Sequence, residues 1–211
     1  MKQVRHLFWD FDGTLYDSYP QVQSAFIKGL EALGLTGMLT NEEMMKRLKI
    51  SVYSTARWYA EQAGLEAQKI IETYHSFRSV EINFPPYEGM ESCLRSLSEA
   101  GYRHYLYTHR DHKAVDQLKQ DGLWELFDDA VLRTDGFPDK PAPDALLALM
   151  ARNGLTPDEC AMVGDRGIDI EAGHNAGMSG YLFDPDGFYA GYPAELSALT
   201  MQELCEKILH A

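Results

Sequence analysis

A short apolar run near the start of the chain ends in two acidic residues. Residues 7–9 are apolar and predict a buried strand, which Asp10 and Asp12 follow before Gly13, a residue that interrupts strands. If the extended backbone continued, both carboxylates would share one sheet face and extend beyond the carboxyl end of the strand. Open α/β sheets bind ligands at that edge. Asp10 and Asp12 are therefore candidate functional residues.

The pattern becomes helical after this strand. Apolar residues recur at spacings of three and four within 22–33, and further helical patterns run through 58–63 and 70–77. Thr40 and Glu43 have the spacing of a capping box, which predicts the start of another helix. This interval contains no convincing strand pattern. The segment from Asp17 to about Asn83 is thus predicted to be a small helical module inserted after the first strand.

Strands and helices alternate in the rest of the chain. Pro85 and Pro86 cannot continue a helix and predict a hinge. Strands are predicted at 104–107, 130–132, 160–163 and 180–183, with helical patterns between them. Such alternation predicts an α/β fold with a Rossmann-like parallel sheet that helices cover on both faces.

The predicted organisation is a catalytic core with one insertion. The core comprises 1–16 and 84–211, and the helical cap domain comprises 17–83. With 211 residues, 45% hydrophobic and 24% charged, the chain has enough material for a substantial core and an ordinary globular composition.

The net charge limits the possible partners. The formal charge of −13 repels phosphate backbones, which argues against a nucleic-acid partner. No apolar run has transmembrane length and no secretory signal pattern is present, so no membrane partner is expected. Cys93, Cys160 and Cys205 are far apart and lack metal-type spacing. These features favour a cytoplasmic protein with buried thiols, which we expect to be a monomer or a weak dimer.

Polar residues follow other predicted strands as well. Thr108 comes directly after the strand 104–107, and Asp165 comes just after the strand 160–163. Because the carboxyl ends of parallel strands lie on one edge of a sheet, we expect these side chains to converge with Asp10.

These motifs resemble those of the haloacid dehalogenase-like hydrolases. The octapeptide Phe-Trp-Asp-Phe-Asp-Gly-Thr-Leu at 8–15 is similar to the first motif of that family. Thr108, Lys140 in an Asp-Lys-Pro-Ala-Pro-Asp segment, and Gly164-Asp165 with Asp169 follow in the family's order. The likeness is to the phosphoglycolate phosphatase and β-phosphoglucomutase branch, whose members have an α-helical cap.

The resemblance implies catalytic roles for four residues. Asp10 would attack phosphorus to form an aspartyl-phosphate, which water then hydrolyses. Asp12 would donate a proton to the leaving oxygen and later take one from water. Thr108 would hydrogen-bond a phosphoryl oxygen, and Lys140 would neutralise charge near the nucleophile. The family often has Asn after this threonine, whereas this chain has His109.

A Mg²⁺ cofactor is also implied. Its ligands would be Asp10, the main-chain carbonyl of Asp12, and Asp165. Asp169, four residues after Asp165, would bind the metal through water or would instead favour a helix dipole.

The resemblance therefore predicts a magnesium-dependent phosphohydrolase, or phosphatase, that acts on a small phosphorylated metabolite. The acid at Asp12 favours phosphate esters or anhydrides, because family members that cleave carbon–halogen bonds lack an acid there. A β-phosphoglucomutase-like phosphomutase or a pyrophosphatase is the alternative. Arg47, Lys49 and Ser51 in the insertion either face the substrate or form a solvated helix end.

Overall fold

The protein consists of two compact units. The computed structural model describes residues 3–78 and 83–211. One unit comprises Met1–Asp17 with Ile82–Ala211, and the other comprises Ser18–Glu81. Residues 79–82, where the predicted insertion nears its end, lie outside the described residues. The assignment of 1–16 with 84–211 to a catalytic core, and of 17–83 to a cap, stays a prediction.

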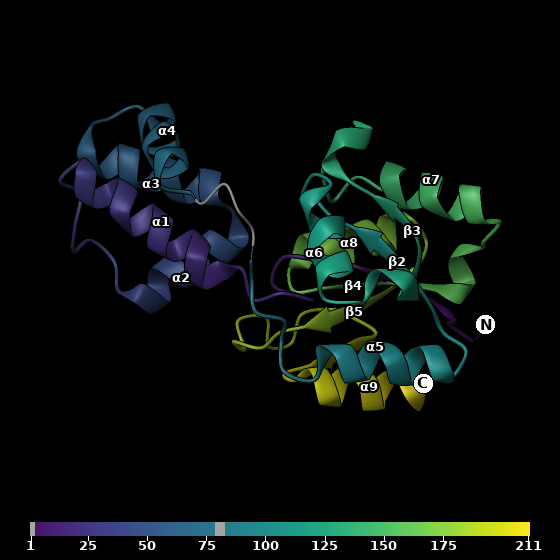
Figure 1. The fold of residues 1–211 in the computed structure, drawn as a ribbon. Coiled ribbons are helices and arrows are strands. Elements are labelled where there is room, and N and C mark those ends of the chain that lie inside the picture. Colours follow the sequence, from purple (N-terminus) through teal and green to yellow (C-terminus); the bar gives the residue numbers. More distant parts are fainter. Residues whose placement is uncertain (1–2, 79–82) are drawn as a thin grey trace. The chain divides into compact units, whose positions relative to one another are not determined.

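The larger unit is built on a parallel sheet with helices on both faces (Figure 1). Its strands are β1 (His6–Trp9), β2 (Arg103–Tyr107), β3 (Phe127–Val131), β4 (Cys160–Gly164), β5 (Ser179–Phe183) and β6 (Leu196–Ala198). Its helices are α5 (Met90–Glu99), α6 (Lys113–Gln120), α7 (Asp144–Asn153), α8 (Gly167–Asn175) and α9 (Met201–Leu209), with single 3₁₀ turns at η1 (Trp124–Leu126), η2 (Arg133–Asp135) and η3 (Pro157–Glu159).

The strand order places β1 between β2 and β4. The sheet runs β3-β2-β1-β4-β5-β6, and every neighbouring pair is parallel. After β1 the chain builds outward through β2 and β3, then returns to the other side of β1 with β4. This reversal is a topological switch point, where open α/β sheets leave a crevice at the carboxyl ends of the strands. The predicted α/β fold is confirmed.

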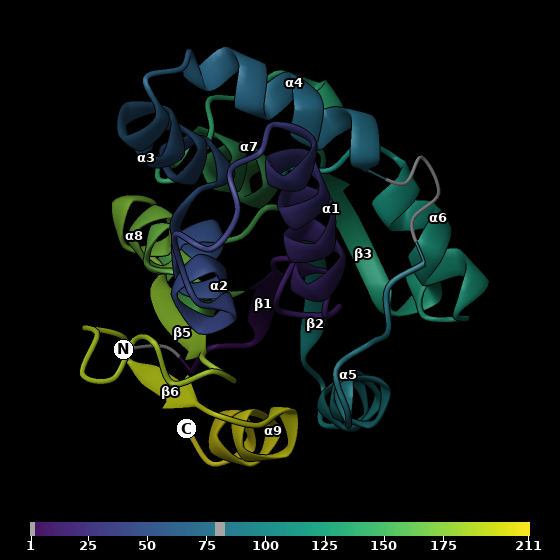
Figure 2. The ribbon, with the colours of Figure 1, turned by 90° about the vertical axis from the view of Figure 1, so that its left-hand side faces the viewer.

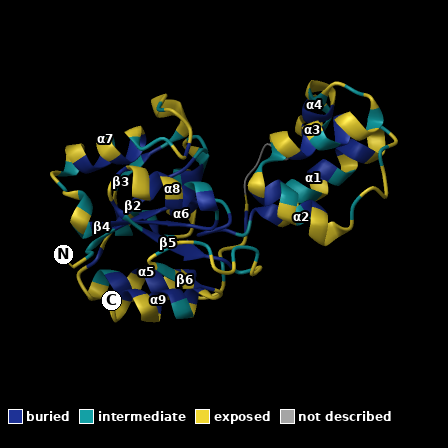
Figure 3. Ribbon diagram, turned by 180° about the vertical axis from the view of Figure 1, so that it is seen from behind, coloured by how far each residue is buried: buried dark blue, intermediate teal, exposed yellow. Residues whose placement is uncertain are grey.

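Alternation along β1 sends its side chains to two separate apolar layers. Leu7 and Trp9 pack with residues of α5, α6 and α9 on one face, whereas Phe8 packs with residues of α7 and α8 on the other. Figure 2 shows α5 and α9 beneath the sheet and α7 above it. In Figure 3 the inner strands of the sheet are mostly dark blue and the outer surfaces of these helices are yellow. Both faces of β1 are thus covered, which explains its uninterrupted apolar sequence.

The two edge strands differ from the sequence prediction. The strand predicted at 130–132 begins at Phe127 and ends at Val131. Asp128 and Asp129 interrupt the apolar pattern from which a strand is predicted, because each pairs with an arginine at the exposed edge of the sheet. The three-residue strand β6 was not predicted at all, since so short an edge strand carries too few residues for a periodic signal.

The smaller unit is helical throughout its described part. It contains α1 (Tyr19–Ala32), α2 (Asn41–Ile50), α3 (Val52–Ala63) and α4 (Ala67–Phe77). The predicted capping box is present: the Thr40 hydroxyl accepts from the Glu43 amide and the Glu43 carboxylate accepts from the Thr40 amide. Gly64 ends α3 in the left-handed conformation. Phe26, Tyr59 and Tyr74 lie in the core of this unit.

Among the described residues, no helix has the combination of length and apolar character needed to cross a membrane.

A buried histidine joins β1, β2 and α5. His104 Nδ1 accepts a hydrogen bond from Trp9 Nε1 at 2.9 Å, and its Nε2 lies 3.1 Å from the carbonyl oxygen of Leu94, to which it donates. The side chain is fully buried. Burial lowers the pKa of His104 to about 4, although its hydrogen bond to Leu94 opposes that shift.

This histidine makes the fold sensitive to acid. Because the unfolded chain binds a proton at higher pH than the folded chain does, stability is complete above a pH of about 6.5 and falls as the pH drops toward about 4. The full loss for one such group is about 3 kcal/mol. Urea unfolding of the wild type and of His104→Gln across this pH range measures how the free energy of unfolding depends on pH. We expect a shallower pH dependence in the variant, and equal slopes would contradict the assignment.

Candidate active site

Asp10 lies directly beyond β1, at the switch point of the sheet. Its amide donates to the carbonyl oxygen of Val163 at 2.9 Å, which continues the β1–β4 ladder by one residue. The preceding residue, Trp9, is in register with Leu106 on β2 and Val163 on β4. Asp10 is therefore flanked by the ends of both neighbouring strands, and it is 2% exposed.

Lys140 brings a buried ammonium to this carboxylate. Its Nζ lies 2.7 Å from Asp10 Oδ1 and 2.8 Å from Asp169 Oδ1. It also donates to the carbonyl oxygen of Tyr107 at 3.2 Å and lies 4.4 Å from the centre of the Tyr107 ring. The Lys140 side chain has no exposed surface. The sequence prediction that this lysine reaches the nucleophile candidate matches the geometry.

The buried charges shift one another's pKa values. Burial raises the pKa of Asp10 to about 6, although Lys140 opposes the shift. Burial disfavours the charged form of Lys140, but Asp10 and Asp169 outweigh it and raise its pKa to about 12. The pKa of Asp169 is lowered despite burial, because Lys140 and Arg166 favour its charged form. The lysine therefore stays a cation beside the two acids.

Three carboxylates gather closely enough to hold a metal ion. One carboxylate oxygen each from Asp10, Asp165 and Asp169 lies within 4.8 Å of the others, and all three side chains are buried. Asp10 Oδ2 has no hydrogen-bond partner among the described residues. Buried oxygen ligands of this kind suit a hard divalent cation such as Mg²⁺. This donor set fits the cofactor that the motifs predict.

Gly164 permits this approach of Asp169 to the strand end. A Cβ on Gly164 would lie 2.2 Å from the Asp169 Cβ, a distance that atoms cannot adopt. Asp169 is the third residue of α8, and its Oδ2 also accepts from the Arg166 amide at 3.1 Å. Asp169 therefore caps the start of α8 and also lies in the acidic cluster, and its role as a metal ligand stays a prediction.

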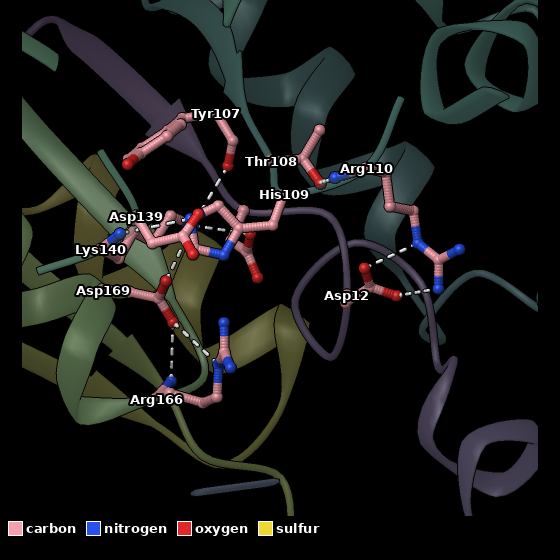
Figure 4. Close-up of polar contacts among 10 residues, drawn as sticks. Asp12, Tyr107, Thr108, His109, Arg110, Asp139, Lys140, Arg166 and Asp169 are labelled. Carbon is pink, nitrogen blue, oxygen red and sulfur yellow. Dashed lines mark hydrogen bonds and ion pairs between the residues drawn. The ribbon is translucent and has the colours of Figure 1, made fainter. Parts of the chain in front are cut away.

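Asp12 takes a different direction from Asp10. The strand ends at Trp9, and the chain turns at Gly13 with a positive φ of 79°. The two acids consequently do not continue one extended face. Both oxygens of Asp12 accept hydrogen bonds from Arg110, at 2.6 Å from Nε and 2.5 Å from Nη2. Figure 4 shows the Asp12 side chain pointing to Arg110 and away from Asp169.

The loop after β2 supplies Thr108 and His109. Thr108 is buried, and its Oγ1 accepts from the Arg110 amide at 3.1 Å. His109 Nε2 accepts from the Lys140 amide at 3.2 Å, so this nitrogen carries no proton. Burial, helped by Lys140, lowers the pKa of His109 to about 4. The neutral His109 thus fixes the backbone of the lysine loop.

The insertion residues that we considered for substrate contact lie in ordered positions of the smaller unit. Arg47 lies over the Trp58 ring at 4.5 Å, and Lys49, 2% exposed, lies over the Tyr19 ring at 4.9 Å. Ser51 caps α3 by accepting from the Ser54 amide. Their contact with substrate stays a prediction.

Comparison with known proteins gives the family. The sequence profile described as "Haloacid dehalogenase-like hydrolase" matches residues 7–182, most of the chain. The chain belongs to the haloacid dehalogenase-like hydrolases. Within this family, the chain is 29% identical over 197 residues to a phosphoglycolate phosphatase of Vibrio vulnificus, covering 85% of this chain and 83% of that protein. It is also 29% identical over 182 residues to the pyrophosphatase PpaX of Bacillus velezensis, covering 83% and 81%.

Solved structures of this hydrolase family share the fold. A putative phosphoglycolate phosphatase from Lactobacillus delbrueckii subsp. bulgaricus superimposes with a TM-score of 0.79 at 21% identity and covers all of both chains. A hydrolase from Streptococcus pneumoniae TIGR4 has a TM-score of 0.62 at 29% identity, covering 86% of this chain and 94% of that one. The helical insertion between β1 and β2 agrees with the cap of such hydrolases.

From the sequence, the backbone amides of His109 and Arg110 were expected beside Thr108, but the contacts of their side chains were not predicted. His109 accepts a hydrogen bond from the Lys140 amide, and Arg110 donates to Asp12. Each of these contacts joins residues far apart in the chain. A basic residue two positions after the strand-end threonine was the available signal for Arg110. That signal gives no partner, because the turn that directs Asp12 toward it depends on Gly13.

Binding of Mg²⁺ at the acidic cluster can be tested without a catalytic assay. Millimolar Mg²⁺ should raise the melting temperature, because a cation relieves the repulsion among the buried carboxylates and binds only the folded chain. An increase of a few degrees, about 1–2 kcal/mol, corresponds to a concentration near ten times Kd. Asp165→Asn should remove most of this increase, while Asp116→Asn, at an exposed position on α6, should retain it. Equal Mg²⁺ responses in both variants would contradict the site.

Proposed function

We propose that this hydrolase is a magnesium-dependent phosphatase that acts on a small phosphorylated metabolite, with Asp10 as nucleophile. The observation that carries this proposal is the buried Asp10 carboxylate, held at 2.7 Å by Lys140 at the switch point of the sheet. A carboxylate kept in place by a fixed cation is ready to attack without a large rearrangement. The relatives named as phosphatases support the same reaction class.

Lys140 and the acidic cluster would overcome charge repulsion in the first step. An attacking carboxylate and an anionic phosphoryl group repel each other unless cations are present. Lys140 supplies one positive charge at Asp10 Oδ1, which leaves Oδ2 as the oxygen with no hydrogen-bond partner in the described part of the chain. A Mg²⁺ ion bound by Asp10, Asp165 and Asp169 would supply further positive charge. Attack by Asp10 then forms the aspartyl-phosphate and breaks the bond from phosphorus to the leaving oxygen.

Asp12 and Thr108 complete the proposed machinery. Asp12 would give a proton to the leaving oxygen and then accept one from the water that hydrolyses the aspartyl-phosphate. Thr108 Oγ1 already accepts a hydrogen bond from the Arg110 amide, so its hydroxyl hydrogen would be donated to a phosphoryl oxygen of the substrate. The products are inorganic phosphate and the dephosphorylated metabolite, and Asp10 is regenerated.

The substrate class is open to a direct assay. Phosphate release from phosphoglycolate, hexose phosphates, nucleotides and pyrophosphate, with Mg²⁺ and with a chelator, distinguishes a monoesterase from a pyrophosphatase. The similarity to PpaX at the same identity as to phosphoglycolate phosphatase makes pyrophosphate an essential member of this panel. Conversion of glucose 1-phosphate to glucose 6-phosphate without phosphate release would instead identify a mutase.

Substitution of the nucleophile tests the mechanism. Asp10→Asn keeps the shape of the side chain but removes its negative charge, so turnover should fall by roughly 10³-fold or more. Asp116→Asn is the matched control, because the Asp116 side chain is exposed on α6. Circular dichroism and urea unfolding would check that both variants fold. Retained turnover in a folded Asp10→Asn protein would overturn the assignment of the nucleophile.

A further inference from the structure

Arg110 holds the Asp12 carboxylate in a paired contact that is less exposed than the Arg152–Asp129 pair of the larger unit. The Arg110 and Asp12 side chains are 13% and 27% exposed, whereas those of Arg152 and Asp129 are 45% and 30% exposed. Arg110 donates from Nε and Nη2 to the two oxygens of one carboxylate. A paired contact of this kind fixes the direction of a carboxylate as well as its distance.

Arg110 is itself held from several sides. Its guanidinium lies 4.5 Å from the centre of the Phe84 ring and 5.7 Å from that of Phe11. Its amide donates to Thr108 Oγ1, and its carbonyl oxygen accepts from the Arg133 amide at 2.9 Å. The guanidinium therefore rests on aromatic faces while the backbone is fixed at the end of β2.

The aromatic support beneath Arg110 is also anchored. The buried side chain of Gln117 on α6 donates from Nε2 to the Phe84 carbonyl oxygen at 2.7 Å, and its Oε1 accepts from the Phe84 amide at 3.3 Å. A buried amide that serves both polar groups of one residue holds that backbone firmly. Phe84 thus has a fixed position from which its ring can limit the movement of Arg110.

We propose that Arg110 is a positioning residue for Asp12, through which it acts on the step that protonates the leaving group. This inference rests on the proposed function, because Asp12 needs positioning only if it transfers protons. Both Asp12 oxygens are occupied in the structure, so one hydrogen bond must open when Asp12 contacts a substrate oxygen. Arg110 then keeps the other oxygen and directs the free one. Without Arg110 the Asp12 side chain would rotate freely.

Leaving-group dependence separates this role from general support of the fold. Departure of 4-nitrophenolate needs little help from a proton donor, whereas departure of the more basic phenolate depends on one. The two aryl phosphates have nearly the same shape, so both probe the same site. Because hydrolysis of the aspartyl-phosphate is common to both substrates, the comparison uses kcat/KM, which reports only the steps up to departure of the leaving group. Arg110→Met should lower kcat/KM for phenyl phosphate by about 10-fold and kcat/KM for 4-nitrophenyl phosphate by less than about threefold. Arg110→Lys should lie between, since lysine keeps the charge but not the paired donors.

A double-mutant cycle shows whether Arg110 acts through Asp12. Asp12→Asn should lower kcat/KM for phenyl phosphate by about 10²-fold. Adding Arg110→Met to Asp12→Asn should cost less than about twofold more, because nothing is left to position. Arg95→Met, at an exposed position on α5, is the control for loss of an arginine. Urea unfolding of every variant shows whether it is folded, and Arg110→Lys replaces Arg110→Met in the cycle if the latter does not fold.

The outcomes distinguish the two proposals. Selective loss on phenyl phosphate together with a non-additive cycle supports Arg110 as the positioning residue. Equal losses on both substrates, or full additivity with Asp12→Asn, would overturn it and leave the phosphatase proposal standing. If the wild type released phosphate from neither aryl phosphate nor any member of the metabolite panel, both proposals would fall.

Discussion

The contact between the Lys140 ammonium and two buried carboxylates is the constraint on which the site depends. Asp10, Asp165 and Asp169 lie together beyond the central strands, where burial opposes their ionisation. One lysine without exposed surface contacts two of them within hydrogen-bond distance. It reduces the cost of gathering these acids and leaves a net negative site. Such a site is stable enough to fold and still favourable to a divalent cation.

The strand order of the sheet brings these residues together at one edge. Asp10 follows β1 and Asp165 follows β4, so parallel pairing alone brings them to one edge. That is why the fold class and this convergence could be predicted from strand patterns and spacing. The Lys140 loop adds a group from a third segment, and His109 fixes its backbone through a contact that no sequence pattern encodes. The motif resemblance identified Lys140 as a site residue, but only the tertiary structure shows that His109 holds its backbone.

The errors of sequence reasoning have physical causes. The edge strand β3 contains acids that pair with arginines instead of alternating with apolar residues, so its beginning at Phe127 was missed. Alternation placed Asp12 beside Asp10, but the turn at Gly13 gives Asp12 a different partner. In each case a side-chain contact between distant segments decided the outcome. Periodicity carries information about faces of single elements and none about such contacts.

The chain leaves and re-enters the larger unit at adjoining points. The Asp17 amide donates to the Pro85 carbonyl oxygen at 2.9 Å, and Tyr16 pairs with Pro86 in an antiparallel bridge. The intervening residues are therefore closed into a loop by contacts that belong entirely to the larger unit. In evolutionary terms, the insertion can be lengthened, shortened or exchanged as one continuous segment without moving the residues at the strand ends. Lineages with the same chemistry can thereby diverge in the molecules they accept.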